Sequence, residues 1–344
     1  MERINPFFSI IVPSYNVEGY ISTCLDSIVG QSFTDYEVIL CDGSTDETAR
    51  ICKEYAAAQP VFSAIFGQDK GLAAARNTGL AAATGKYVLF LDADDFLEPN
   101  CLAALVWQMS RRPDCDLYMN DYFDYYSAEN RVLVEAREPE GDARGVNGML
   151  ASLFRKNGNY IVFSWRHAFR RALLVERGIC FDGVLRGCED YDFFMRVMMS
   201  AQRVCASGIA THNYRRAREG SLTSSASPHL LMDNLGVFAR WYEHIAKSPP
   251  DAGRDFLLND IAGKFLFYTI QAGGLPKRKS RSLLRFAGEN RHIIRAARGR
   301  FVSPARVALS VFGMRFGTKL MNLLFRGMRK GIRRSLVSGR SEPG

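Results

Sequence analysis

Short apolar runs alternate with amphipathic stretches through the first hundred residues of the chain. The apolar runs predict strands, and they occupy residues 7–12, 36–41, 62–66 and 87–91. Stretches with helical periodicity separate these runs, and they occupy residues 17–29, 45–57 and 72–83. Because strands that alternate with helices are typical of βαβ units, the sequence predicts an α/β fold with a mostly parallel sheet flanked by helices.

Small residues and glycine mark the ends of the predicted helices. Ser44 and Thr45 are suited to cap the second helix, and Gly85 is suited to end the third. Much later in the chain, a run of small residues ends at Pro228, which is typical of a linker.

The chain beyond the first hundred residues is expected to contain fewer strands. Residues 99–111 predict a helix and residues 116–125 predict a strand, and a polar loop is expected over residues 128–145. With the linker as the boundary, we expect an α/β domain over residues 1–226 and a largely helical, basic region over residues 227–344.

Composition places the 344-residue chain among ordinary globular proteins, with 47% hydrophobic and 24% charged residues. The apolar runs are shorter than the roughly 18 to 20 residues that span a bilayer, so no transmembrane helix is expected. The N-terminus lacks the pattern of a secretory signal, which favours the cytoplasm. The eight cysteines form no pair at zinc or redox spacing, and we expect most of them to be reduced core residues.

The net charge of +9 is distributed unevenly. From Leu275 onward, 18 Lys and Arg residues stand against two acidic residues, whereas the preceding part of the chain is acidic. Four apolar residues of this basic tail fall on one face at helical spacing: Phe312, Phe316, Leu320 and Leu323. Such a helix can lie on an anionic membrane surface, and we expect the tail to dock there. The alternative is a helix packed on the first domain; a nucleic-acid partner is not expected, because the tail lacks an RNA-binding pattern.

An acidic triplet follows the fourth predicted strand. Asp92, Asp94 and Asp95 come at the end of an apolar run, where open α/β sheets place their ligand crevices. Because alternate residues of a strand point to one side, Asp92 and Asp94 can face one ligand together. Carboxylates at this spacing suit Mg²⁺ or Mn²⁺ that holds a diphosphate. The alternative is a solvated acidic turn.

Three further features are ambiguous when each is taken alone. Asp42 follows another apolar run and can accept hydrogen bonds from a ligand, although Asp-Gly-Ser is also a common turn. Tyr15 follows the first run and can lie against a nucleobase or pack in the core. Glu189 and Asp190 can be catalytic, or they can stabilise the start of a helix.

Taken together and in this order, the motifs resemble those of the inverting family 2 glycosyltransferases, which have the GT-A fold. The resemblance covers roughly residues 6–226 and rests on five segments: residues 10–16, 42–46, 71–79, 92–95 and 189–190. It implies a GT-A sheet, mixed but mostly parallel, with a helical C-terminal extension. The ordered set is more specific than any single motif.

The resemblance implies a nucleotide pocket. Asp42 matches the nucleotide-contacting aspartate of the family, and Pro13, Tyr15 and Arg76 match other positions of that pocket. Members of the family often carry two acidic residues before Gly-Ser, whereas this chain has Cys41 in place of the first. This departure bears on the nucleotide pocket and on its selectivity for a base.

The resemblance also implies the groups that perform the transfer. Asp92 and Asp94 match the DxD motif, which engages the ribose and the metal-bound diphosphate of the donor, and Asp95 is adjacent. Asp190 matches the catalytic base, with Glu189 beside it. Mn²⁺ or Mg²⁺ is the implied cofactor.

Four additional residues are candidates for contact with donor, acceptor or metal. Arg218 and Ser221 lie in a segment that resembles one that closes the catalytic domain in such enzymes, and the alternative is a solvated basic loop. Trp165 can stack on a sugar face or pack in the core. His212 is a weaker candidate for a metal or phosphate contact.

These features predict an enzyme that moves a sugar from a nucleotide diphosphate, with UDP expected, to a hydroxyl of a glycan. A membrane-docked tail favours a lipid-linked glycan acceptor at the inner face of the cell membrane, as in surface polysaccharide assembly. One rival is a degenerate GT-A-like binding or scaffolding protein, which only Cys41 supports. The other is a nucleotidyltransferase, which would carry a glycine- and basic-rich loop that is missing near the N-terminus.

Overall fold

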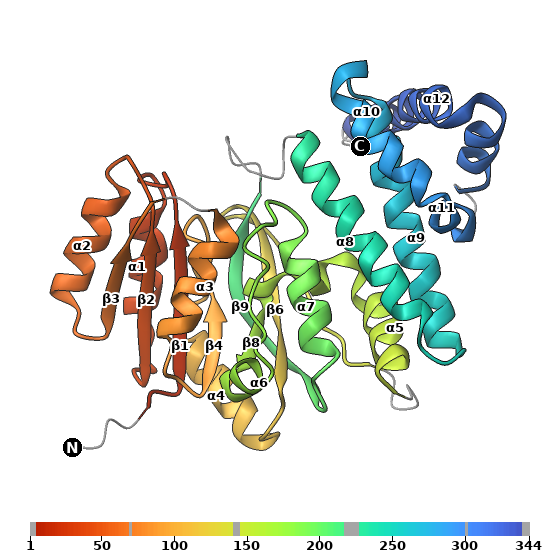
Figure 1. Cartoon of the computed structure of the whole chain (residues 1–344). Coiled ribbons are helices and arrows are strands. Elements are labelled where there is room, and N and C mark those ends of the chain that lie inside the picture. The colour runs from red at the N-terminus through yellow and green to blue at the C-terminus, as the bar shows by residue number, and fades with distance from the viewer. Residues whose placement is uncertain (1–4, 69–70, 140–144, 217–226, 300–301, 339–344) are drawn as a thin grey trace, which may run out of the picture. The chain divides into compact units, whose positions relative to one another are not determined.

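The computed structural model describes residues 5–68, 71–139, 145–216, 227–299 and 302–338 (Figure 1). The chain divides into two compact units, residues 1–222 and residues 223–344. The expected boundary after residue 226 falls in the segment 217–226, which lies outside the described residues.

Unit 1 is built on one mixed sheet. Within the described residues, its strands follow the order β3-β2-β1-β4-β8-β6-β9-β5, and β7 pairs with β6. The strands are β1 (Phe8–Ser14), β2 (Tyr36–Asp42), β3 (Phe62–Phe66), β4 (Tyr87–Phe90), β5 (Phe96–Leu97), β6 (Leu117–Ser127), β7 (Asn130–Val134), β8 (His167–Arg170) and β9 (Val204–Arg215). Strands β1 to β4 are parallel, as the sequence predicted, and β8 runs antiparallel between β4 and β6.

Helices flank the sheet of unit 1 (Figure 1). They are α1 (Ile21–Val29), α2 (Thr48–Ala58), α3 (Leu72–Ala82), α4 (Cys101–Arg111), α5 (Gly145–Asn157), α6 (Arg171–Glu176) and α7 (Glu189–Met198), with 3₁₀ turns at Gly158–Val162 and Ser164–Arg166. The predicted helices are therefore present, and α1 and α2 begin later than their apolar periodicity suggested.

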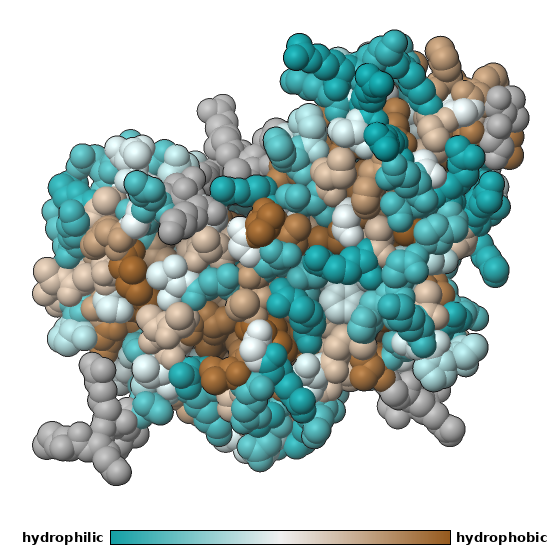
Figure 2. Space-filling model, in the orientation of Figure 1, coloured by the Kyte–Doolittle hydropathy of each residue, from teal (hydrophilic) through white to brown (hydrophobic). Residues whose placement is uncertain are grey.

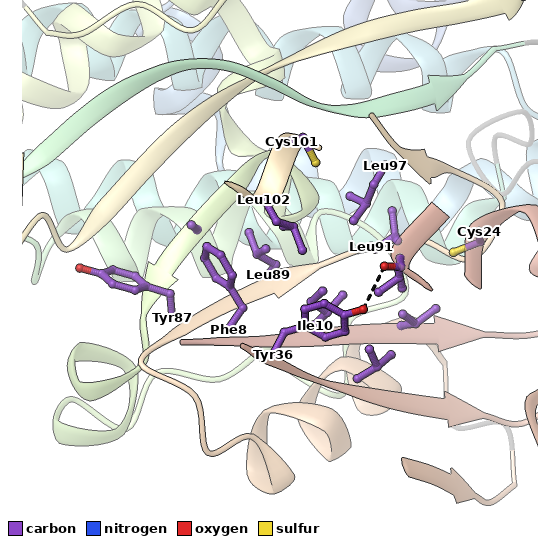
Figure 3. Packing of buried hydrophobic residues seen from close by; sticks show 14 of the residues in the cluster. Phe8, Ile10, Cys24, Tyr36, Tyr87, Leu89, Leu91, Leu97, Cys101 and Leu102 are labelled. Carbon is purple, nitrogen blue, oxygen red and sulfur yellow. Dashed lines mark hydrogen bonds between the residues drawn. The ribbon is translucent and has the colours of Figure 1, made fainter. Parts of the chain in front are cut away.

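The core of the parallel half lies between β1, β4 and the helices α1 and α4. Phe8, Ile10 and Leu89 point from the sheet into this layer, where Leu102 meets them (Figure 3). The buried Tyr36 hydroxyl donates to the carbonyl of Ile28 at 3.0 Å, so this polar group has a hydrogen-bond partner inside the protein. Alternation along the strands directs the intervening side chains to the opposite face, which α3 covers.

Two helix-end assignments from the sequence are wrong. Helix α2 starts at Thr48 and not near Ser44, whose hydroxyl instead donates to Asp42 at 2.6 Å. Helix α3 ends before Gly85, which lies in a close approach between chain segments. A Cβ on Gly85 would come within 2.6 Å of the backbone nitrogen of Ser9, so only glycine fits there.

The polar segment after β6 is not the simple loop that its composition indicated. It contains β7, whose residues pair antiparallel with β6 as a hairpin. Strand β7 is short and largely exposed, so the buried alternation by which strands are recognised is missing.

Most of the cysteines are free, as expected, and four of the free ones are buried: Cys24, Cys41, Cys52 and Cys101. The remaining pair departs from the expectation. Cys115 and Cys205 form a disulfide with a Cα–Cα distance of 6.3 Å, and it joins the segment before β6 to β9. The two residues are 90 positions apart, so spacing alone could not reveal the pairing.

Unit 2 is helical, as the sequence predicted. Its helices are α8 (Pro228–Ala246), α9 (Ala252–Gly273), α10 (Lys277–Glu289), α11 (Arg291–Ala296) and α12 (Val302–Ser338). The Ser227 side chain caps α8 by accepting from the Leu230 backbone N–H. Helix α12 breaks at Gly313, whose φ of 69° is accessible to glycine. Among the described residues, no helix combines the length and apolarity that crossing a bilayer requires.

Candidate active site

A buried arginine lies at the centre of the candidate site. The Arg76 side chain is 1% exposed, and its two terminal nitrogens donate to different carboxylates. One nitrogen is 2.9 Å from Asp92 Oδ1 and the other is 2.9 Å from Asp190 Oδ1. Glu189 Oε1 lies 3.6 Å from the nitrogen that binds Asp190. The structure thus brings the first aspartate of the predicted DxD motif and the predicted base to one guanidinium.

Helix α3 and the segment before α7 are joined beside this arginine. The Asn77 side chain donates to the Phe181 carbonyl and accepts from the Phe181 N–H, both at 2.8 Å. The Phe181 ring stacks on Phe193 of α7 and lies 5.3 Å from the Arg76 guanidinium. These contacts fix α3 against the chain that leads to Asp190.

Glu189 and Asp190 open α7, so their expected position at the start of a helix is confirmed, and their catalytic role stays a prediction. Three acidic residues lie in the first turn, where negative charge stabilises the helix dipole. Burial and the neighbouring Asp190 raise the pKa of Glu189 above its usual range, while Arg76 opposes the rise.

The acidic triplet lies in the turn between β4 and β5 and not on a strand. The Asp95 N–H closes this turn by donating to the Asp92 carbonyl at 2.9 Å. Burial raises the pKa of Asp92, Asp94 adds to the rise, and Arg76 opposes it. The strand-alternation argument was therefore wrong for these residues, although Asp92 and Asp94 still act on each other electrostatically.

Asp95 has a different role from its neighbours. It is 1% exposed, and its Oδ1 accepts from the Arg215 N–H at 2.7 Å. The Arg215 side chain donates to the Asp94 carbonyl at 2.8 Å, and its guanidinium lies 5.0 Å from the Phe96 ring. Asp95 therefore anchors the turn to β9.

The carboxyl ends of β1 and β2 carry the predicted nucleotide residues. Asp42 is 5% exposed and accepts from the Ser14 hydroxyl at 2.7 Å and from the Ser44 N–H at 3.2 Å. Tyr15 is 49% exposed at the end of β1, whereas Pro13 is buried within the strand. Asp42 and Tyr15 thus lie at the sheet edge where ligands of α/β proteins bind.

Cys41 does not share the side of the sheet that Asp42 faces. A Cβ added to Gly79 of α3 would lie 3.2 Å from the Cys41 sulfur, so this thiol packs under α3. Burial raises the pKa of Cys41 to about 12. The departure from the family pattern therefore lies in the core.

The structure assigns two candidate contacts to the core. Trp165 is 2% exposed and stacks on Phe163 and Tyr214, which is the packing alternative. His212 is fully buried, with its Nε2 3.1 Å from the Phe90 carbonyl and its Nδ1 2.7 Å from the Thr211 hydroxyl. Both nitrogens are occupied, so the metal or phosphate role is wrong for His212.

Two other candidates have no structural outcome. Arg218 and Ser221 lie outside the described residues.

The carboxylates fit a metal ion that a substrate helps to bind. Among the residues whose positions are described, no group of three or more His, Cys, Asp or Glu could hold a metal ion. Mg²⁺ and Mn²⁺ are often held by one or two carboxylates with substrate phosphates. Asp92 and Asp94 match this mode, because burial and, less strongly, the charge of Asp94 raise the pKa of Asp92, and a divalent cation would offset both effects.

The sequence pattern of the family described as glycosyl transferase family 2 matches residues 9–176, which include β1 to β4, Arg76 and the acidic turn. Residues 9–176 therefore form a glycosyl transferase family 2 domain.

Several curated members of the family are similar to this chain. The uncharacterised glycosyltransferase EpsJ of Bacillus subtilis is 31% identical over 220 residues, which are 61% of each chain. Chondroitin synthase of Escherichia coli is 32% identical over 193 residues, 56% of this chain and 26% of its own length. The similarity thus spans less than two thirds of the length of these relatives.

A solved structure shares the fold. S. aureus TarS residues 1–349, crystallised with UDP-GlcNAc, superimposes with a TM-score of 0.70 and 21% identity, over 93% of this chain and 91% of that one. This similarity shows the GT-A fold with C-terminal helices.

Sequence reasoning missed the residues that hold the site together. The Arg215 side chain donates to the backbone carbonyl of Asp94, which is 121 positions away in the chain. The Asn77 side chain donates to the backbone carbonyl of Phe181, which is 104 positions away. Asn77 stands inside a motif that the resemblance used, so a signal for it was present. Arg215 lies in the segment that also carries Arg218 and Ser221 and that entered the resemblance, but nothing in the sequence distinguished it from the other arginines there.

Proposed function

We propose that the chain is an inverting glycosyltransferase that moves a sugar from a UDP-sugar to a hydroxyl of a glycan or lipid-linked glycan, in surface polysaccharide biosynthesis. The observation that carries the proposal is the guanidinium of Arg76, which holds Asp92 and Asp190 at 2.9 Å each. It joins a donor-binding carboxylate to a candidate base within one site.

The chemistry assigns a task to each carboxylate. Asp190 accepts the proton of the acceptor hydroxyl as that oxygen attacks the anomeric carbon, and attack opposite the leaving group inverts the configuration. Asp92 and Asp94 would hold Mg²⁺ or Mn²⁺, which neutralises the charge that develops on the departing diphosphate. Asp42 accepts hydrogen bonds from the nucleoside, and Tyr15 offers an exposed ring to the base.

Two observations support UDP as the nucleotide. The relative TarS is described as a poly(ribitol-phosphate) β-N-acetylglucosaminyltransferase and is 28% identical over 77% of this chain. It was crystallised with UDP-GlcNAc and with UDP.

The rival scaffold interpretation rested on Cys41. Because this thiol packs against α3 and not beside the Asp42 carboxylate, it gives no reason to expect a damaged nucleotide pocket.

Calorimetric titration tests the donor proposal. We expect UDP to bind in the presence of Mn²⁺, to bind more weakly with chelator, and to be preferred over GDP. Transfer from UDP-sugars to oligosaccharide acceptors, followed by analysis of the anomeric configuration, then tests inversion. Binding of neither nucleotide, or a product with retained configuration, would contradict the proposal.

We further propose that unit 2 docks on an anionic membrane surface, which would make the protein peripheral at the inner face of the cell membrane. One face of α12 packs on α9: Thr318 is fully buried, and the Asn322 side chain donates to the Ile270 carbonyl at 3.1 Å. Other apolar residues of α12 stay open: Phe316, Leu320 and Leu323, which follow the break at Gly313, are 69%, 41% and 60% exposed. Phe312 is 55% exposed but precedes the break, so the prediction that all four share one helical face was wrong for Phe312. Figure 2 shows hydrophilic and hydrophobic side chains close together on the helices of unit 2.

Charge complementarity indicates which partner covers this open face. Arg315 and Lys319 are exposed on the same helix, and the sequence from Leu275 onward is strongly basic. Apolar side chains flanked by cations suit the boundary between anionic headgroups and acyl chains.

Flotation with liposomes that contain phosphatidylglycerol tests the docking. We expect binding that weakens in high salt, and Phe316→Ser combined with Leu323→Ser should abolish it. Val175→Ser is a matched control, because Val175 is 59% exposed in unit 1. No binding at low salt would contradict the proposal, and so would dimers that form through the same residues without lipid.

A further inference from the structure

The resemblance places Arg76 among the nucleotide-binding residues, but its surroundings are unlike those of a ligand contact. Its side chain is 1% exposed, and its terminal nitrogens already bind protein carboxylates. We infer that Arg76 is a positioning residue that orients the base Asp190 and ties it to the donor-binding Asp92. This inference rests on the proposed function, since it concerns the same reaction.

The geometry of the guanidinium carries the inference. Its terminal nitrogens are fixed in one plane, so donation to Asp92 and to Asp190 sets the separation between the two carboxylates. A lysine ammonium is a single point of charge on a flexible stem and could not hold both oxygens in this arrangement.

Packing keeps the guanidinium in place. Arg76 lies near the Phe181 ring, and α3 is joined to the Phe181 backbone through both polar atoms of Asn77. Because Phe181 stacks on Phe193 of α7, the arginine and the helix that carries Asp190 share one rigid support. A group fixed in this way can hold a base within the narrow range of positions that proton transfer requires.

Charge gives a second reason for the arrangement. Three carboxylates, those of Asp92, Glu189 and Asp190, lie within 3.6 Å of this one side chain. Arg76 supplies the positive charge that offsets the mutual repulsion of these partly buried carboxylates. The N–H groups that make these pairs are unavailable to a nucleotide base, and Nε, which has no hydrogen-bond partner among the described residues, is buried.

The two roles of Arg76 predict different kinetics. A residue that contacts the nucleotide contributes to binding of the donor. Its loss therefore weakens donor affinity and leaves kcat largely intact. A residue that positions the base contributes to the transition state, so its loss lowers kcat and leaves nucleotide affinity largely intact.

Arg76→Lys and Arg76→Ala test the inference in the full chain. We expect kcat to fall by about 10²-fold in Arg76→Lys, the lower end of what a general base contributes, and further in Arg76→Ala. UDP affinity with Mn²⁺, measured by calorimetry, should change less than about threefold, a difference below 1 kcal/mol. Added guanidinium should restore part of the turnover of Arg76→Ala but none of that of Asp190→Asn.

Arg166→Lys is the matched control for the loss of a buried guanidinium. Arg166 is also 1% exposed, but it donates to the backbone carbonyls of Asn120 and Glu135 in the core. This variant should lower the melting temperature and keep kcat. If Arg76→Ala does not fold, the kcat and affinity of Arg76→Lys decide the question.

The inference is overturned if Arg76→Lys keeps wild-type kcat, whether or not its UDP affinity falls. It is also overturned if Arg166→Lys loses as much kcat as Arg76→Lys, because the effect would then come from core damage. Failure of the proposed function is a separate result, since the wild-type chain would then transfer no sugar.

Discussion

Cys41 and Asp42 are chain neighbours whose side chains serve different purposes. They end β2, where successive side chains point to opposite faces of the sheet. Asp42 accepts from Ser14 and Ser44 at the ligand edge, whereas Cys41 packs under Gly79 of α3. An acidic residue at position 41 would bury a carboxylate against this helix.

Substitution of these two neighbours should therefore separate binding from packing. We expect Asp42→Asn to weaken UDP affinity about tenfold, because a hydrogen bond to a charged group contributes roughly 1.5 to 3 kcal/mol. Cys41→Ala should leave UDP affinity unchanged and lower the melting temperature, because it removes a buried side chain. Titration calorimetry and thermal melts measure both effects, and equal losses of affinity in the two variants would contradict the assignment.

Asp190 lies at the start of α7 with one oxygen bound to Arg76. We expect Asp190→Asn to lower kcat by about 10² to 10⁴-fold, because an amide cannot accept the proton of the acceptor hydroxyl. Steady-state transfer assays measure this change, and UDP affinity should persist.

Asp192 supplies the control on the same helix. It is 3% exposed and pairs with Arg196 at 2.8 Å, so Asp192→Asn should lower stability and retain turnover. Wild-type kcat in Asp190→Asn would remove Asp190 from the role of base.

The elements of unit 1 differ in how well local sequence specifies them. Strands β1, β2 and β4 are buried apolar runs, and β3 is a partly exposed apolar run at the edge of the sheet. Periodic helices separate these four strands, and the sequence predicted all of them. Strand β7 was missed because its residues are mostly exposed and its partner β6 decides its conformation. Local pattern therefore identifies apolar strands that alternate with periodic helices better than a short, exposed hairpin strand.

The candidate site was predictable where it coincides with a motif. Asp42, Asp92 and Asp190 lie at the ends of elements that the sequence located, and the structure brings Asp92 and Asp190 to one guanidinium. The burial of Arg76 was not predictable, because its partner Asp190 is more than a hundred positions away in the chain. The burial of Trp165 was not predictable either, because it depends on how several aromatic rings pack together.

The disulfide connects two elements that pair in parallel, β6 and β9, near the start of their ladder. Cross-linking residues 90 positions apart restricts the unfolded chain, so we expect Cys115→Ala with Cys205→Ala to lower the free energy of unfolding by about 2 to 4 kcal/mol. Urea denaturation measures the change.

Thiol titration of the denatured protein without reductant checks the bond itself. The disulfide predicts six reactive thiols among the eight cysteines. Eight thiols would contradict it, and Cys52→Ala, which removes a buried free thiol, is a control that should leave the bond intact.

The stability of unit 1 depends in part on a neutral histidine in its interior. His212 on β9 is fully buried, and burial lowers its pKa to about 4. Its Nε2 donates to the Phe90 carbonyl, which leaves Nδ1 to accept from the Thr211 hydroxyl. Because burial penalises the charged ring, the fold selects the neutral form, whose Nε2 links β9 to the end of β4.

This linkage predicts how stability changes with pH. In the unfolded chain His212 is protonated near its usual pKa of about 6.5, whereas in the folded chain it stays neutral until about pH 4. Stability from the neutral ring is therefore fully present above pH 6.5 and is lost as the pH falls toward 4, by about 1.4 kcal/mol per pH unit.

Because other groups also titrate in this range, the informative quantity is the difference between wild type and His212→Gln. We expect the wild type to be more stable at pH 7.5 and its advantage in urea denaturation to shrink between pH 6.5 and 4.5. A difference that stays constant over this range would show that His212 is not held neutral by the fold.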